Sequence, residues 1–258
     1  MSQNIEDLVG ELSEKGFGYI PIDSQRINEA KDAARCFIES LEHVHAGWKF
    51  ARPGEHEPDV GVIDKAGKDI KTYFHSAHDL GFLKGNKPAT SQQIECLRVM
   101  DGCRYLLETL GLDIAACLAG ELGLPNLKQL VRESAKLSSA YNVSTLRFLS
   151  HLDVSDQKGA RAHHDRSFLT MHLGDSGGSL LIQNKAGMWE YASPPQGSAL
   201  VFFGVKILEL TNGKFEPILH KSTTARGKER TAAVMFIHAD IGRQVSDAEA
   251  EYKRFHAQ

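Results

Sequence analysis

Cysteine is scarce in this 258-residue chain, which contains only four, and no two of them form a close pair. All four fall in stretches with helical periodicity, at Cys36, Cys96, Cys103 and Cys117. This distribution provides neither the paired spacing of a zinc knuckle nor a disulfide framework. We therefore expect reduced thiols that pack in the core.

Long apolar runs and an excess of one charge are also missing. No segment approaches membrane-spanning length. The polar, acidic residues 1–16 lack the basic start and apolar centre of a secretory leader. The 30 lysines and arginines nearly balance 33 acidic residues, giving a net charge of −3, and are spread along the chain. The sequence thus predicts a cytoplasmic protein that binds a small molecule rather than nucleic acid or a membrane. It indicates no oligomeric state.

Helical periodicity dominates the first half of the chain. At 41% hydrophobic and 24% charged residues, the chain can bury the core of one structural unit. Apolar stripes predict helices over 5–12 and 27–38, within 92–122, and over 127–136. The segment 16–22, GFGYIPI, predicts a strand between the first two helices. Residues 47–75 are rich in Gly, Pro, His and Asp and lack a period, so we expect an extended loop over a site.

Short alternating strands separated by Gly, Asn and Pro turns follow residue 141 and are typical of a jelly roll. The predicted class is α+β, a double-stranded β-helix (jelly-roll) core with amino-terminal helices packed against it. Residues 1–140 would form a helical region with the first strand and the substrate loop. Residues 141–240 would form the jelly-roll core and 241–258 a carboxy-terminal surface helix, all in one structural unit.

A pattern of metal-binding side chains lies within this second half. His163 and Asp165 are two residues apart, so on an extended strand they point to the same side while His164 faces away. His220 follows 57 residues after His163, far enough for short strands to turn back. Two histidines and one carboxylate form a facial triad that suits non-haem Fe(II), because positions opposite remain open. Zinc remains possible on ligand type alone.

Arg230 extends the pattern. The segment 224–228 contains Gly227 in a turn-like context, so we expect a hairpin that places His220 and Arg230 on one face of a sheet. A planar guanidinium grips a carboxylate at two points. The cosubstrate that needs a metal chelator at one end and a carboxylate clamp at the other is 2-oxoglutarate. A zinc hydrolase has no need for this arginine.

At these residues the sequence resembles the Fe(II)/2-oxoglutarate-dependent oxygenases, in particular the isopenicillin N synthase-like branch. The first-ligand strand of that branch is similar to 162–172, AHHDRSFLTMH, with a leucine and a threonine at Leu169 and Thr170. Further likeness extends over nearly the whole chain, in 8–22 (LVGELSEKGFGYIPI), 177–191 (GGSLLIQNKAGMWEY), 195–203 and 210–220 (LTNGKFEPILH).

The resemblance implies roles for individual residues. His163, Asp165 and His220 would bind iron, and Arg230 would hold the far carboxylate of 2-oxoglutarate. His151 stands where the family often has a tyrosine near the cosubstrate. No catalytic residue is implied beyond the iron ligands, and the substrate-binding residues are not encoded.

Two positions depart from the family pattern. Ala232 stands where the family usually has a serine that helps to bind the distal carboxylate, and Leu149 stands where it often has an asparagine. These departures leave Arg230 as the main clamp and do not affect the metal ligands.

The activity implied is oxidation of an unactivated C–H bond by O2 with release of succinate and CO2. Halogenases of the wider superfamily replace the iron-binding carboxylate, whereas Asp165 is kept here, so hydroxylation, or a related desaturation or ring closure, is favoured. We expect a small polar substrate such as an amino acid or a derivative. The alternatives are an Fe(II) oxidase of the same fold that does not use 2-oxoglutarate, a metal-dependent hydrolase, and a non-catalytic binding barrel.

The remaining candidates are weaker. Tyr73, Phe74 and His75 would either line the substrate pocket or pack in the core. Arg147 and Arg166 would be surface charges or charges beside the metal ligands. Surface or core roles are expected of the other histidines near the site, His164, His172 and His238.

Overall fold

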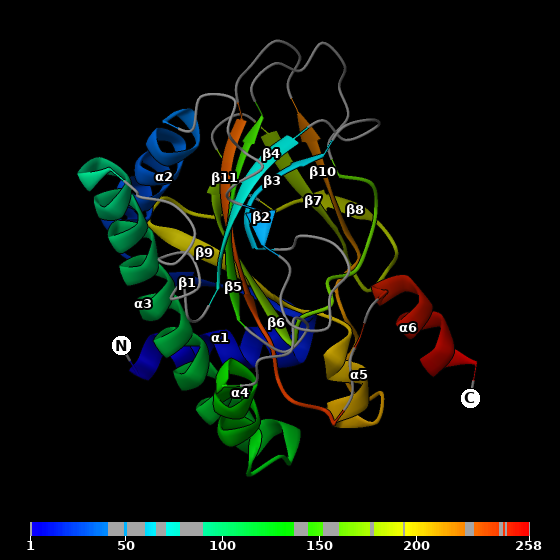
Figure 1. The fold of residues 1–258 in the computed structure, drawn as a ribbon. Helices are drawn as coiled ribbons and strands as arrows, with labels where there is room; N and C mark the ends of the chain where they lie inside the picture. Colours follow the sequence, from blue (N-terminus) through cyan, green and yellow to red (C-terminus); the bar gives the residue numbers. More distant parts are fainter. Residues whose placement is uncertain are drawn as a thin grey trace.

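The protein is described here from a computed structural model, which describes residues 2–40, 49–50, 60–65, 71–77, 90–136, 144–151, 160–175, 178–192, 194–224, 230–242, 245 and 247–257. Two antiparallel sheets face each other, and most helices cover the outer face of the larger sheet (Figure 1). The shorter helices α5 and α6 lie at the side of the smaller sheet (Figure 1).

The larger sheet combines strands from both halves of the sequence. Its strand order is β1-β9-β6-β11-β5-β4-β3-β2. The bounds in this order are Phe17–Pro21, Ser198–Phe203, Leu169–Asp175, Arg230–Ile237, Thr145–His151, Lys71–Ala77, Val60–Lys65 and Lys49–Phe50. The first strand of the chain, β1, therefore pairs with β9, which lies much later in the sequence, and Phe17 is opposite Phe202.

The smaller sheet has the order β10-β7-β8, with bounds His220–Thr224, Gly178–Gln183 and Trp189–Tyr191. Its apolar side chains pack against those of the larger sheet, so Leu180 and Ile182 of β7 share a buried cluster with Leu200 and Phe202 of β9. This sandwich of two antiparallel sheets with helices on one side is the predicted jelly-roll architecture, which is confirmed.

Helices occupy most of the expected positions. They are α1 (Ser2–Lys15), α2 (Ser24–Glu39), α3 (Ser91–Leu122), α4 (Leu127–Lys136), α5 (Lys206–Thr211) and α6 (Ala248–His256). The long α3 begins with a capping box between Thr90 and Gln93 and ends at Gly123, whose φ of 66° is left-handed. In the described parts of the chain, no helix is long and apolar enough to cross a membrane.

The side chains of the larger sheet alternate between two environments. In β11, Ala233, Met235 and Ile237 are buried against the helices. Val234 and Phe236 therefore lie on the other face, which we call the inner face because it is turned toward the smaller sheet. This alternation decides which residues can approach a site between the sheets.

The expected loop over residues 47–75 is wrong in part. Strands β2, β3 and β4 lie in this region and extend the larger sheet. Phe74 of β4 is fully buried, and its ring lies 5.2 Å from that of Phe37 in α2. In β4, Phe74 buries against α2, a signal that the surrounding Gly and Pro residues obscured in the sequence.

The four cysteines are free, as expected. Cys96 and Cys103 are buried, and burial raises the pKa of the first thiol to about 11 and of the second to about 12. Cys117 is exposed, so the expectation of core packing is wrong at this position. It lies on the outward side of α3, which packs only part of its circumference against the protein.

Candidate metal centre

A short β-bridge links His163, in the loop before β6, to His220 of β10 in the smaller sheet. The backbone N–H of His163 donates to the carbonyl of His220 at 2.9 Å, and the N–H of His220 donates to the carbonyl of His163 at 3.1 Å. This exchange places the imidazole centroids 4.3 Å apart. The expected strand through His163 and Asp165 is wrong, since β6 begins only at Leu169. The bridge, not strand parity, brings these ligands together.

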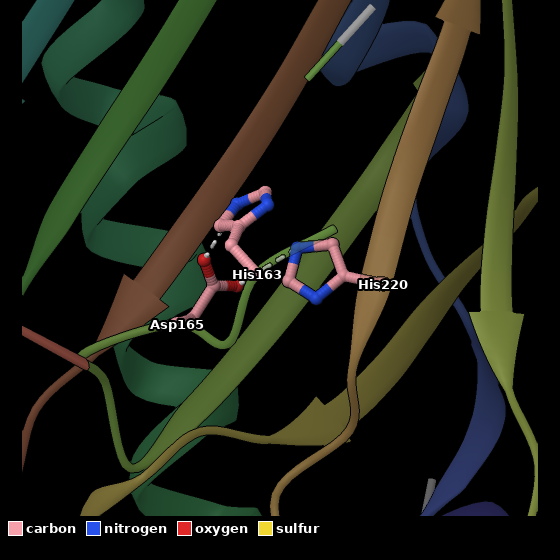
Figure 2. A group of neighbouring side chains, drawn as sticks. All are labelled: His163, Asp165 and His220. Carbon is pink, nitrogen blue, oxygen red and sulfur yellow. Dashed lines mark ion pairs between the residues drawn. The ribbon is translucent and has the colours of Figure 1, made fainter. Parts of the chain in front are cut away.

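Asp165 completes the cluster (Figure 2). Its Oδ1 lies 3.7 Å from Nε2 of His163 and its Oδ2 lies 3.6 Å from Nε2 of His220. One candidate ligand atom from each residue lies within 4.8 Å of the other two. Ligands bound about 2.1 Å from one ion at near-right angles lie about 3 Å apart, so this spacing fits a single metal ion after a small contraction.

The hydrogen bonds of both rings direct Nε2 toward this centre. Nδ1 of His163 lies 2.7 Å from the carbonyl of Arg161, and Nδ1 of His220 lies 3.2 Å from the carbonyl of Ile218. A carbonyl can only accept, so each Nδ1 carries the hydrogen and each neutral ring keeps its Nε2 lone pair for a metal. The donor set fits the metal that the sequence predicts.

Asp165 is held from several directions. The hydroxyl of Thr170 donates to its Oδ2 at 2.7 Å, and the N–H of Val205 donates to its backbone carbonyl at 2.8 Å. Gly204 passes so close that a Cβ there would lie 2.8 Å from the Asp165 carbonyl oxygen and closer still to that of Ser167. The loop before β6 is therefore pinned against the end of β9.

The electrostatics of the cluster follow from burial and charge. Burial would raise the pKa of Asp165, but His220, His163, the Thr170 hydrogen bond and Arg147 together lower it. For His220, burial outweighs the attraction of Asp165 and lowers the pKa. The metal-free site thus favours a charged carboxylate beside a neutral imidazole, which are the forms that bind a metal.

His164 points away from the cluster into a contact with α6. Its N–H and its Nδ1 lie 2.8 Å and 2.9 Å from Oε1 of Glu249, and its ring stacks on Tyr252 at 4.4 Å. It is buried, so of the two roles expected for it the core role is confirmed. His172, on the inner face of β6, and His238, just after β11, do not join the metal cluster.

Arg230 and His151 lie directly opposite each other in neighbouring strands. The expected hairpin between His220 and Arg230 is wrong, because β10 pairs with β7 in the smaller sheet while β11 pairs with β5 and β6. Ala232 and Leu149, the two departures from the family pattern, are also partners across these strands. The side chains of Arg230 and His151 lie outside the described part, so their cosubstrate roles stay predictions.

Arg147 was expected to be either a surface charge or a charge beside the metal ligands. It is half-buried on the inner face of β5, and its Nε donates to Nε2 of His75 in β4 at 2.6 Å. Of the three residues expected to line a pocket or the core, Phe74 packs in the core, His75 lies on the inner face, and the side chain of Tyr73 lies outside the described part. A surface role for Arg147 is thus wrong.

Comparisons with a family model and with solved structures indicate which class of protein the chain resembles. Residues 137–239 match the family model of the 2OG-Fe(II) oxygenase superfamily. The structure superposes on that of a 2OG-Fe(II) oxygenase family protein from Caulobacter crescentus with a TM-score of 0.73, covering 100% of this chain and 95% of that chain at 19% identity. It superposes on AtDAO1, the dioxygenase for auxin oxidation 1 from Arabidopsis thaliana, with a TM-score of 0.71, covering 93% and 91% at 14% identity.

Sequence relatives point to the same class. Gibberellin 2-beta-dioxygenase 4 of Arabidopsis thaliana is 24% identical over 199 residues, which are 71% of this chain and 59% of that protein. The segments aligned with the curated relatives span 20% to 59% of those proteins' lengths.

The family match covers residues 137–239, and the jelly-roll fold is the one shared with the oxygenase structures named above. The isopenicillin N synthase-like branch, inferred from the sequence motifs, agrees with these relatives. The matched family model is named for Fe(II) and 2-oxoglutarate, and His163, Asp165 and His220 form a donor set that fits Fe(II).

Proposed function

We propose that the protein is a non-haem Fe(II)/2-oxoglutarate-dependent dioxygenase that hydroxylates an unactivated C–H bond of a small polar metabolite, such as an amino acid or a derivative. The observation that carries the proposal is the convergence of two imidazole Nε2 atoms and one carboxylate within 4.8 Å. Asp165 and His220 are buried whereas the side chain of His163 is 40% exposed, so the cluster is reachable from one side.

In this proposal His163, Asp165 and His220 hold the iron, and Arg230 with His151 opposite it holds the far carboxylate of 2-oxoglutarate. When bound, the iron supplies the reaction of O2 with 2-oxoglutarate and substrate, in which R–H, O2 and 2-oxoglutarate give R–OH, succinate and CO2. The side chains named above orient the iron and 2-oxoglutarate.

Water exclusion and ligand positioning come from residues around the cluster. The ring of Phe202 lies 4.8 Å from that of His220 and covers one side of it. Thr170 fixes Oδ2 of Asp165 and leaves the carboxylate directed at the two Nε2 atoms. Protein groups that orient metal ligands in this way tune affinity as well as geometry.

A same-fold Fe(II) oxidase that does not use 2-oxoglutarate is the second candidate. The observation that favours it is the apolar pairing of Ala232 with Leu149, next to the pairing of Arg230 with His151. Succinate formed in equal amount to product would exclude this oxidase. The hydrolase and binding-barrel alternatives stay open to the same assay, because neither produces succinate.

The test is anaerobic reconstitution with Fe(II) followed by 2-oxoglutarate, monitored by the weak visible charge-transfer band of the chelate. We expect the band in the wild type and its loss or weakening in Arg230→Ala. Arg132→Ala removes an exposed arginine on α4 and should leave the band unchanged. No band in iron-loaded wild type would favour the oxidase, and failure to load iron would favour zinc or a binding role.

Organisation and location remain proposals too. We keep the division into a helical region at 1–140, a jelly-roll core at 141–240 and a terminal helix at 241–258. The cytoplasm stays a proposal for its location. Nucleic acid and membranes stay unexpected partners because the charges are balanced and dispersed.

A further inference from the structure

Two of the four cysteines meet where α2 packs against α3. Cys36 lies near the end of α2 and Cys96 near the start of α3. Nε2 of Gln92, one turn before Cys96, donates to Sγ of Cys36 at 3.2 Å. One turn beyond Cys36, Oγ of Ser40 accepts a hydrogen bond from Nε2 of Gln93 at 3.0 Å. These two bonds between the helices bring the side of α3 that carries Gln92 and Cys96 against Cys36.

The two thiols also contact each other directly. Burial first, and then a hydrogen bond with the side chain of Cys36, raise the pKa of Cys96 to about 11. A hydrogen bond that raises this pKa is one that the protonated thiol donates, so the S–H of Cys96 is directed at Sγ of Cys36. Cys96 belongs to the buried core, and Cys36 is partly buried against it. The two sulfurs are therefore neighbours in a packed helix interface, as a disulfide requires.

The remaining cysteines are too far from Cys96 to pair with it. Cys103 and Cys117 follow Cys96 in the same helix, so they lie about 10 Å and about 30 Å farther along its axis. A disulfide joins residues whose Cα atoms are about 4.4–6.8 Å apart. Cys36, whose sulfur meets that of Cys96, is therefore the partner that these positions allow within one chain.

The two thiols differ in how easily a solute can reach them. Cys36 is half-buried and its neighbour Gln92 is exposed, so Cys36 lies at the rim of the helix interface. Cys96 is buried, and its raised pKa keeps it protonated near neutral pH. An oxidant in solution therefore meets Cys36 first, and Cys96 lies behind it as the second thiol of a two-step oxidation.

We propose that Cys36 and Cys96 are a redox-sensitive pair that hydrogen peroxide converts into a disulfide between α2 and α3. In the first step the Cys36 thiolate attacks one peroxide oxygen and becomes a sulfenic acid. The O–O bond breaks, and the other oxygen leaves as hydroxide and takes up the proton that Cys36 released. This inference is independent of the proposed metal chemistry.

The second step joins the two sulfurs. The Cys96 sulfur attacks the Cys36 sulfur, the S–O bond breaks, and the hydroxide leaves as water with the Cys96 proton. Two thiols and one hydrogen peroxide thus give one disulfide and two water molecules. The two sulfurs are oxidised and supply the two electrons that reduce the peroxide.

The disulfide closes a long segment of the chain. Cys36 and Cys96 are 60 residues apart, and β2, β3 and β4 lie between them. A bond between residues this distant removes conformational freedom from the unfolded chain, so it stabilises the fold if it forms without strain. Because Phe37 of α2 packs on Phe74 of β4, the bond also holds the helix that covers this strand.

The test treats the full chain, reduced and kept free of iron with a chelator, with an excess of hydrogen peroxide. Peptide mapping by mass spectrometry without reduction then identifies the bonded cysteines. We expect a linked pair of peptides containing Cys36 and Cys96, lighter by two hydrogen atoms than the free peptides, that separates after dithiothreitol is added. Tm should rise by about 5–15 °C on oxidation and return to its original value on reduction.

Single variants separate the two steps. Cys96→Ala should leave a sulfenic acid on Cys36, which dimedone traps, whereas Cys36→Ala should leave Cys96 as a thiol. Both variants should lose the rise in Tm. Cys103→Ala and Cys117→Ser are the matched controls, and both should form the linked peptides and keep the rise in Tm.

Several results would overturn the inference. Oxidised wild type without the linked peptides would show that the sulfurs are too far apart to bond, as would equal dimedone labelling of Cys36 in wild type and Cys96→Ala. Labelling of Cys96 in Cys36→Ala as fast as that of Cys36 in Cys96→Ala would contradict the order of the two steps. A disulfide that lowers Tm would show that the bond forces the helices out of their native packing.

Discussion

The hydroxyl of Thr170 is the nearest support of the candidate metal ligand Asp165, and it is buried. Thr170→Val keeps the shape but removes the donor. We expect a loss of about 10–100-fold in Mn(II) or Fe(II) affinity, as for other groups that orient metal ligands. Thr109→Val, at an exposed position on α3, is the matched control. Unchanged metal affinity in Thr170→Val would show that Asp165 is oriented without this bond.

Protonation of the cluster predicts a pH-dependent stability for the metal-free protein. Burial lowers the pKa of His220 from its usual 6.5, so the folded chain binds fewer protons there than the unfolded chain. Its contribution is therefore complete above about pH 6.5 and is lost as the pH falls toward the folded pKa. The pKa of Asp165 is also lowered from its usual 3.8, so this group changes the stability in the same direction at pH values below 3.8.

Urea unfolding checks this sign. The midpoint should be lower at pH 5.5 than at pH 7.5, and His220→Asn should reduce the difference because it removes one titrating group. A wild-type midpoint that rises toward pH 5.5 would contradict the assignment of a neutral buried imidazole.

At the scale of single residues, the sequence predicted those parts of the site that a short motif determines. His163 and Asp165 form a short motif, and His220 follows at a plausible distance, so the cluster could be anticipated. The contact between Arg147 and His75 could not, because His75 is 72 residues earlier in the chain. Register across strands is set by the burial of whole faces and has no local signature.

Two glycines of α3 allow the effect of core packing on stability to be distinguished from the effect of helix propensity. A Cβ at Gly111 would lie 2.8 Å from Cδ1 of the buried Ile237 in β11, whereas at Gly102 it would meet nothing within 4 Å. Gly102→Ala should therefore stabilise the protein by about 0.5–1 kcal/mol. Gly111→Ala should destabilise it by about 1–3 kcal/mol because the core is overpacked. Chemical unfolding of both variants decides, and equal stabilisation would refute tight packing of α3 on β11.

Helix α6 supports the ligand loop through Glu249, which accepts both hydrogen bonds from His164. Glu249→Ala should loosen the loop between His163 and Asp165 and lower Mn(II) affinity by about tenfold, while Glu249→Gln keeps an acceptor and most of the affinity. Lys253→Ala changes an exposed residue of the same helix and should have no effect. Identical losses in both Glu249 variants would point to charge rather than hydrogen bonding.

Helices with a strong periodic pattern of apolar residues were predictable from the sequence, whereas the pairing of strands was not. The helix over 127–136 was expected with its observed bounds, because its apolar and polar residues separate cleanly around the axis. The hairpin between β10 and β11 failed because β10 pairs with β7, where Ser222 and His220 become buried. Proximity in sequence favours a hairpin, but burial between two sheets outweighs it.

The whole molecule should be stabilised by its expected ligands, since both would bind only the folded chain. At 100 times the dissociation constant, a ligand contributes about 2.7 kcal/mol. For a protein of this size each kcal/mol shifts Tm by about 2–4 °C. We expect Mn(II) to raise Tm by about 5–10 °C and 2-oxoglutarate to raise it further. In Arg230→Met only the Mn(II) increment should remain, and retention of both would refute the clamp.

The pairing of β1 with β9 must wait for much of the chain to be synthesised. Residues 17–21 wait for their partners at 198–202, which lie about 180 residues later. At roughly 5–20 residues per second, a ribosome needs roughly 10–35 s to make that stretch. During this interval the edge that β9 will cover stays open, and His220 has not yet been made. The metal cluster is therefore among the last parts of the fold to assemble, and the emerging chain has no complete site at which to capture iron too early.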